Sequence, residues 1–211
     1  KTNLILVKNR ANEINDIKNI KSVLIFDDGL QDKSISYDLS IVCFSSINGI
    51  GNGKLLPAGP LREQLSQLNK YDTVFINGNK NKKLESKIRL NNKDIKIFYG
   101  KYFLKNKKQF SSKSNYLAVC GIGTPENFFD LLRQNKINIK KKIIFPDHFQ
   151  YRLSDVKNLK SIAKKNKLKI ITTEKDFMKF KKFKNFDIEY TSVILKINNL
   201  NKLKNMLKIY L

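Results

Sequence analysis

The chain has 211 residues, of which 41% are hydrophobic and 10% aromatic. This is enough to bury the core of one large domain or two small ones, and it excludes a disordered chain. No apolar run approaches the roughly 20 residues of a membrane-spanning helix, and the apolar start is too short for a signal peptide. Two cysteines, Cys43 and Cys120, are too few for a disulfide framework or a zinc site. Both lie in apolar runs and are predicted to be core side chains of a cytoplasmic protein.

The formal net charge of +24 at pH 7 is typical of proteins that bind nucleic acid or anionic membranes. The cations are 37 Lys against only 5 Arg, with 25 Asn and 25 Ile beside them, a composition typical of an AT-rich genome. Proteins that read phosphates or bases rely on the bidentate arginine fork. We therefore expect no nucleic-acid partner, although a basic surface would still favour an anionic lipid face.

Short apolar segments alternate with amphipathic segments along the whole chain. In the first half we predict strands at 2–7, 22–28, 38–44, 73–76 and 96–103, helices at 11–20 and 61–68, and a glycine-rich loop at 48–60. In the second half we predict strands at 116–120, 142–145, 169–173 and 192–197, and helices at 124–135, 154–166 and 200–211. The strands are continuous Val/Ile/Leu/Phe runs, which indicates parallel strands covered on both faces. The predicted fold class is α/β.

Two Lys/Asn-rich stretches, 79–94 and 104–115, contain few apolar residues and predict the position of a domain boundary. We place the boundary within the second stretch, between residues 107 and 108. This gives one domain at 1–107 and a smaller α/β domain at 108–211.

Four segments carry candidate chemistry at predicted strand ends, where α/β proteins bind ligands. Asp27 and Asp28 follow an apolar run and could hold Mg²⁺, or they could simply form a polar turn. The loop at 49–63 is not a Walker A motif, but its Arg62 could clamp a phosphate; otherwise it is just a long loop. His148 is the only histidine and could act as a general base, although a lone histidine is more often structural. The segment at 170–176 is interpreted as structural, with Thr173 capping a helix.

Together these segments resemble the tetraacyldisaccharide 4'-kinases of lipid A synthesis. The matching motifs are DDGLQ at 27–31, GNGKLLPAGPLRE at 51–63, CGIGTPENFF at 120–129, PDH at 146–148 and TTEKD at 172–176. They occur in the family's order and span nearly the whole chain, and the thirteen-residue loop motif is the most specific. The resemblance implies a P-loop-type α/β sandwich, incomplete in residues 1–107, followed by the second α/β domain.

The resemblance also implies an ATP-dependent phosphotransferase that uses Mg²⁺ to phosphorylate the 4'-hydroxyl of tetraacyldisaccharide 1-phosphate. Carried over to this sequence, Asp27 and Asp28 would hold Mg²⁺, and Asp28 and Gln31 would bind the nucleotide. Arg62 and Glu63 would lie at the active site, with Arg62 neutralising phosphate charge. Asp147 and His148 would come from the second domain, with the histidine activating the sugar hydroxyl. The implied location is the cytoplasmic surface of the inner membrane.

Three features depart from the family pattern. The family's P-loop, with its GKT/S segment, is not among the 211 residues, Asp32 stands where the family usually carries His, and a single His148 replaces a His-His pair. We therefore interpret the chain as an N-terminally truncated kinase and expect these residues alone not to transfer phosphate. The alternative is a catalytically inactive basic α/β module that binds anionic lipid or nucleic acid.

Overall fold

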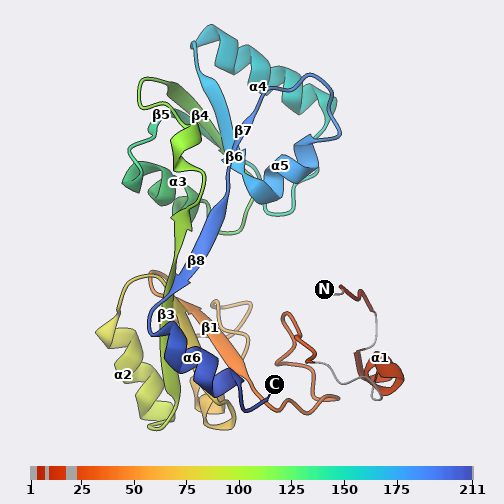
Figure 1. The fold of residues 1–211 in the computed structure, drawn as a ribbon, viewed down its shortest axis with the longest axis vertical. Coiled ribbons are helices and arrows are strands. Elements are labelled where there is room, and N and C mark those ends of the chain that lie inside the picture. Colours follow the sequence, from red (N-terminus) through yellow and green to blue (C-terminus); the bar gives the residue numbers. More distant parts are fainter. Residues whose placement is uncertain (1–3, 8–9, 18–22, 211) are drawn as a thin grey trace. The chain divides into compact units, whose positions relative to one another are not determined.

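The computed structural model describes residues 4–7, 10–17 and 23–210. Residue contacts divide the chain into two compact units, Lys1–Lys101 with Ile197–Leu211, and Tyr102–Lys196 (Figure 1). This division differs from the boundary at 107/108 expected from the sequence, because the C-terminal segment belongs to the first unit. There Leu203 and Met206 pack with Phe98 in one buried cluster.

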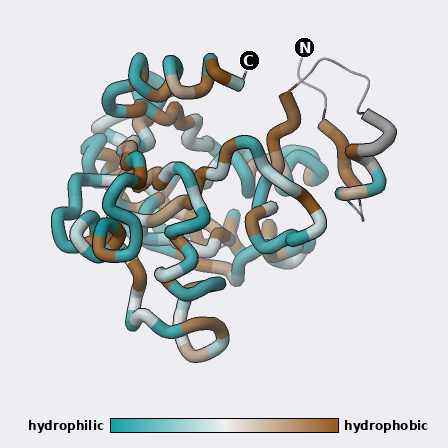
Figure 2. Tube along the Cα trace, turned by 90° about the horizontal axis from the view of Figure 1, so that it is seen from below, coloured by the Kyte–Doolittle hydropathy of each residue, from teal (hydrophilic) through white to brown (hydrophobic). Residues whose placement is uncertain are grey.

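The first unit holds a sheet with strand order β1-β2-β3-β8, in which β1 pairs with β2 and β2 with β3 in parallel. Strands β3 and β8 each begin in one unit and end in the other. Helix α6 alternates hydrophobic and hydrophilic residues along its turns (Figure 2), as a helix with one buried face does. The elements are α1 (Arg10–Ile17), β1 (Ile41–Ser45), η1 (Leu65–Lys70), β2 (Thr73–Asn77), α2 (Lys82–Asn91), β3 (Lys96–Leu104), β8 (Val193–Ile197) and α6 (Leu200–Leu207).

The second unit holds an all-parallel sheet with strand order β5-β4-β6-β7. Its elements are η2 (Lys107–Gln109), β4 (Asn115–Cys120), α3 (Pro125–Gln134), β5 (Asn138–Ile144), α4 (Leu153–Lys165), β6 (Lys169–Thr173), α5 (Glu174–Phe180) and β7 (Glu189–Thr191). The chain leaves β4 for β5 on one side and returns to β6 on the other. This reversal beside β4 is the place where open α/β sheets bind ligands, at the carboxyl ends of the strands.

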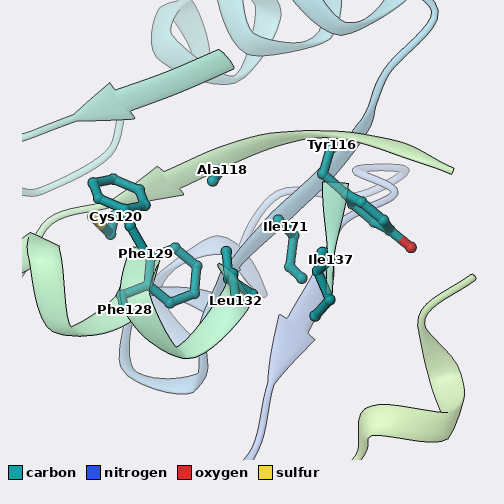
Figure 3. Close-up of a cluster of buried hydrophobic side chains, with 8 residues drawn as sticks. All are labelled: Tyr116, Ala118, Cys120, Phe128, Phe129, Leu132, Ile137 and Ile171. Atoms are coloured by element: carbon teal, nitrogen blue, oxygen red, sulfur yellow. The ribbon is translucent and has the colours of Figure 1, made fainter. Parts of the chain in front are cut away.

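Strand β4 is buried on both faces, as its unbroken apolar sequence predicts. One face packs against Phe128, Phe129 and Leu132 of α3 (Figure 3). The other face packs in a second cluster that includes Val156 and Leu159 of α4 and Phe180 of α5. The predicted α/β fold class is confirmed, and covering on both faces holds for the central strands β4 and β6, whereas β5 and β8 are mostly exposed.

The two N-terminal strands that we predicted are absent from the described residues. Residues 4–7 and 23–26 have irregular backbone, and the side chains of Leu4 and Ile25 are 86% and 91% exposed. An apolar run forms a strand only when a neighbouring strand pairs with it, and within the described ranges no strand pairs with either segment. Residues 2, 3 and 22 of these predictions, like 18–20 of the first predicted helix, lie outside the described residues.

Three further predictions were wrong. The helix predicted at 61–68 is instead the 3₁₀ helix η1, which begins four residues later, at Leu65. Leu61 cannot belong to it because it forms an isolated β-bridge with Leu55. The stretch at 79–94 contains helix α2, since Leu84 and Ile88 at helical spacing are enough to bury one face. Cys43 is exposed on the edge strand β1, whereas Cys120 is buried as expected.

Candidate functional site

The segment 27–31 forms a turn that side chains from elsewhere in the first unit hold in place. Asp28 has a positive φ of 52°, and the Tyr37 hydroxyl donates a hydrogen bond to the main-chain oxygen of Gly29 at 2.6 Å. The Arg10 guanidinium donates to the main-chain oxygen of Asp27 at 2.9 Å, so that contact does not involve the Asp27 carboxylate. Desolvation raises the pKa of the nearby Cys43 thiol, and the charges of Asp27 and Asp28 raise it further.

Arg62 joins this turn to the glycine-rich loop. Its Nη2 lies 3.2 Å from Asp28 Oδ2, and its Nη1 donates to Gln31 Oε1 at 3.4 Å. The side chains of Arg62 and Asp28 are 53% and 72% exposed, so the ion pair lies at the surface and is open to a ligand. The structure thus brings together three of the predicted site residues over 31 to 34 positions of sequence.

The loop before Arg62 is folded upon itself. The Asn52 side-chain amide donates to the Ala58 oxygen at 2.8 Å, and the Leu56 amide donates to the Leu61 oxygen at 2.8 Å. A Cβ at Gly59 would come within 2.1 Å of Asn52 Oδ1 and 2.4 Å of the Lys54 oxygen, so only glycine fits there. The loop therefore presents Arg62 from a fixed backbone rather than from a free coil.

Glu63 follows Arg62 and accepts a hydrogen bond from the Tyr71 hydroxyl at 2.7 Å. Desolvation, and after it this hydrogen bond to a carboxylate, raise the pKa of Tyr71 to about 12. The observed partner of Glu63 is therefore Tyr71, while Arg62 is the residue that contacts the acidic turn.

The acidic turn has the donors that a magnesium ion needs. Among the described residues no cluster of three or more His, Cys, Asp or Glu could hold a metal ion. Protein Mg²⁺ sites, however, often use only one or two carboxylates and complete the octahedron with water and substrate phosphates. The carboxylates of Asp27 and Asp28, on adjacent residues of the turn, are the groups that could hold such an ion, and Arg62 contacts Asp28.

The second unit places Asp147 and His148 in the loop after β5. His148 has a positive φ of 59°, and its main-chain amide donates to Asp147 Oδ1 at 2.9 Å. Its imidazole Nε2 lies 3.9 Å from Asp147 Oδ2, too far for a hydrogen bond, and the ring is 78% exposed. Asp147 therefore contacts its neighbour through the main chain and not through the ring.

Lys175, in the first turn of α5, completes this cluster and was not among the predicted site residues. Its Nζ lies 3.4 Å from Asp147 Oδ1. Partial desolvation works to raise the pKa of Asp147, but the hydrogen bond from the His148 amide and the charge of Lys175 outweigh it and lower that pKa. The TTEKD motif was the available signal for Lys175, but it was interpreted as a helix start.

The helix start in that motif is nonetheless real. Thr173 is the N-cap of α5 and its side chain accepts a hydrogen bond from the Asp176 amide, as predicted. Asp176 is fully buried and accepts from the Gly121 amide at 2.8 Å. The motifs that follow β4, β5 and β6 therefore meet at one edge of the second sheet.

Acidic and basic side chains on loops that follow parallel strands are typical of α/β proteins that handle phosphate groups. Comparison with known proteins identifies one family within this class. A model of the tetraacyldisaccharide-1-P 4'-kinase family matches residues 1–211, so the chain belongs to that family.

Curated relatives agree with this assignment, and one solved structure shares the fold. The chain is 42% identical to the tetraacyldisaccharide 4'-kinase of Pelagibacter ubique over 187 residues, 88% of this chain and 60% of the relative. It is 37% identical to that of Rickettsia akari, covering 88% of this chain and 55% of the relative. The crystal structure of LpxK from Aquifex aeolicus in complex with ATP shares the fold with a TM-score of 0.55 and 20% identity, over 86% of this chain and 55% of that one. The chain thus spans 55–60% of the length of these relatives.

Proposed function

We propose that the chain is the larger part of a tetraacyldisaccharide 4'-kinase, which transfers the γ-phosphate of ATP to the 4'-hydroxyl of tetraacyldisaccharide 1-phosphate. The observation that carries this proposal is the guanidinium of Arg62, which contacts both Asp28 and Gln31 from a loop that fixes its backbone. Phosphoryl transfer depends on positioning and charge stabilisation, and a guanidinium group held beside the Asp28 carboxylate supplies both.

Each site residue has a role that its chemistry supports. Asp27 and Asp28 would hold Mg²⁺, which when bound neutralises charge on the transferred phosphate. Gln31 and Asp28 bind the nucleotide, and Arg62 stabilises the developing phosphate charge, with Glu63 beside it. His148 accepts the proton of the sugar hydroxyl, since a 78% exposed imidazole is open to substrate. Asp147 orients His148 through its main-chain amide.

The direct test is a phosphotransfer assay on the longest protein that the gene encodes, with ATP, Mg²⁺ and tetraacyldisaccharide 1-phosphate. We expect turnover, and we expect His148→Gln to lower kcat by about 10²–10⁴-fold because a general base is lost. The 211-residue chain should give no turnover. A folded His148→Gln variant with wild-type kcat would contradict the role of His148, and turnover by the 211 residues alone would contradict the interpretation as a kinase fragment.

The alternative is a basic module that binds anionic lipid or nucleic acid without catalysis. It predicts no phosphotransfer by the longest protein, together with tight binding to RNA or anionic vesicles that weakens steeply as salt rises. The two outcomes are therefore distinguishable in the same preparation.

We further propose that the protein works on the cytoplasmic surface of the inner membrane. No helix among the described residues is long and apolar enough to cross a membrane. The second unit has a cavity of about 450 Å³ with an apolar lining of Phe177, Phe180, Phe183, Phe186 and Ile188 and a polar lining of Lys181, Asn185 and Asp187. Lys182 and Lys184 extend from the same segment and are exposed. The partly exposed rings of Phe183 and Phe186 within this lysine-rich segment suit an anionic lipid surface, because such rings can enter the interface while the cations meet the headgroups; Phe180 is buried and belongs to the core.

Neutralising three lysines of this segment should therefore weaken membrane binding. We expect Lys181→Gln/Lys182→Gln/Lys184→Gln to reduce partitioning onto phosphatidylglycerol-containing vesicles by about 100-fold, at roughly 1 kcal/mol per lysine. The matched control, Lys80→Gln/Lys82→Gln/Lys83→Gln, removes the same charge from exposed residues of the first unit. Vesicle co-sedimentation measures both. Equal losses in the two variants would show that net charge, not this segment, drives binding.

A further inference from the structure

The first turn of α5 is held more rigidly than a short helix end requires. Buried Asp176 accepts hydrogen bonds from the Gly121 amide at 2.8 Å and the Thr173 hydroxyl at 3.0 Å, and it pairs with Lys179 Nζ at 3.1 Å. These contacts tie the turn to the end of β4 and to its own N-cap. A side chain that leaves this turn therefore starts from a fixed backbone position.

Lys175 is the residue immediately before Asp176, and its ammonium reaches the loop that carries the histidine. Its Nζ lies 3.4 Å from Asp147 Oδ1, across 28 positions of sequence. The same oxygen accepts from the His148 amide at 2.9 Å. The other carboxylate oxygen lies near Gly123, where a Cβ would come within 3.1 Å of it. The carboxylate thus has Lys175 on one side, Gly123 on another, and the imidazole 3.9 Å away.

In this geometry the Asp147 carboxylate can pair with either of two groups, the Lys175 ammonium or a protonated His148 imidazole. The carboxylate can stay on Lys175 and the His148 amide, or it can turn toward the imidazole when the ring is protonated. The first arrangement keeps His148 in its left-handed conformation, because the carboxylate oxygen holds the main-chain amide at that φ. It also leaves the imidazole nitrogens free to accept a proton from a substrate.

We propose that Lys175 is a positioning residue that holds the Asp147 carboxylate on the His148 main chain and away from the His148 ring. This role rests on the proposed function for its catalytic consequence, whereas its structural part stands on the contacts alone. Without Lys175 the carboxylate loses its nearest cation other than His148 and turns toward the imidazole.

The structural part is tested on the 211-residue chain by following the Asp147 carboxyl carbon by NMR as pH changes. Lys175→Met removes the cation, so we expect the pKa of Asp147 to rise, because the nearby positive charge that favours the carboxylate is lost. Lys175→Arg should restore the wild-type titration. Lys182→Met is the matched control, since it removes the same charge from an exposed position further along the chain. An unchanged Asp147 titration in Lys175→Met would overturn the proposal.

The catalytic part is tested by kinetics on the longest encoded protein. We expect Lys175→Met to lower kcat about tenfold or more with KM for ATP within a factor of two, and Lys175→Arg to recover most of kcat, because a misplaced catalytic group costs rate rather than nucleotide binding. A shifted Asp147 titration with unchanged kcat would overturn the positioning role. If the wild-type protein itself shows no turnover, the proposed function fails, while the NMR result still decides whether Lys175 holds Asp147.

Discussion

Replacing Asp176 with alanine is expected to destabilise the protein by about 3 kcal/mol, the largest stability loss among the site residues. The carboxylate is fully buried and receives three donors, so the substitution leaves the Gly121 amide without its acceptor and Lys179 without its partner. The Lys179 side chain is only 18% exposed, which limits how well water can replace the lost carboxylate. Burial and, after it, the charge of Asp176 raise the pKa of the Tyr151 hydroxyl, which shows how closely this carboxylate adjoins the aromatic core.

Urea unfolding followed by far-UV circular dichroism measures this effect in the 211-residue chain. Asp187→Ala is the matched control, because it removes an exposed carboxylate from the same unit and should stay within about 0.5 kcal/mol of wild type. Asp176→Asn keeps the shape and one acceptor oxygen, so it should lie between the two. An Asp176→Ala variant as stable as Asp187→Ala would show that the buried network contributes little.

Most elements of the second unit could be predicted from the sequence, although β7 was missed and only the end of β5 was placed. The sequence of β4 is a continuous apolar run from Tyr116 to Cys120. A strand buried on both faces needs apolar side chains at every position, so this run predicts it directly. Helix α3 starts at Pro125 after Thr124 with Glu126 in its first turn, as its sequence indicates. Thr124 stands at the N-cap position, but its side chain makes no capping hydrogen bond.

The first unit was less predictable, because contacts with distant segments determine there whether a stretch of chain forms a strand, a helix or a loop. Residues 23–26 are as apolar as β4, but they have no paired neighbour within the described chain and stay irregular. Helix α2 lies in a stretch so rich in Lys and Asn that only Leu84 and Ile88 reveal a buried face. The composition of this stretch therefore concealed a helix that was not predicted from the sequence.

The candidate site was predictable only in part for a related reason. The motifs identified Asp28, Gln31 and Arg62 separately, and the structure joins them through one guanidinium. The contact between Lys175 and Asp147 depends on how the loops after β5 and β6 meet, which no local pattern encodes. Its residue type gave no hint either, since lysines occur throughout this chain.

Replacing Arg62 with methionine should lower kcat of the longest encoded protein by about 10³-fold. A guanidinium that meets transferring phosphate charge contributes on this order, and no other residue contacts both Asp28 and Gln31 among the described side chains. Arg62→Lys keeps the charge but loses the fork, so it should recover only a small part of the rate. A steady-state assay at saturating ATP measures both variants.

Stability separates this kinetic role from a structural one. The Arg62–Asp28 pair is exposed on both sides, and exposed ion pairs contribute at most about 1 kcal/mol, so Arg62→Met should unfold at nearly the wild-type urea concentration. Arg133→Met is the matched control, because Arg133 also forms exposed ion pairs, with Glu126 and Asp130, at a position outside the proposed site. If Arg62→Met and Arg133→Met have equal kcat, Arg62 only tethers the loop to the turn. If Arg62→Met alone loses rate at unchanged stability, the guanidinium acts on the phosphate, and the contact with Asp28 and Gln31 is the resting position from which it does so.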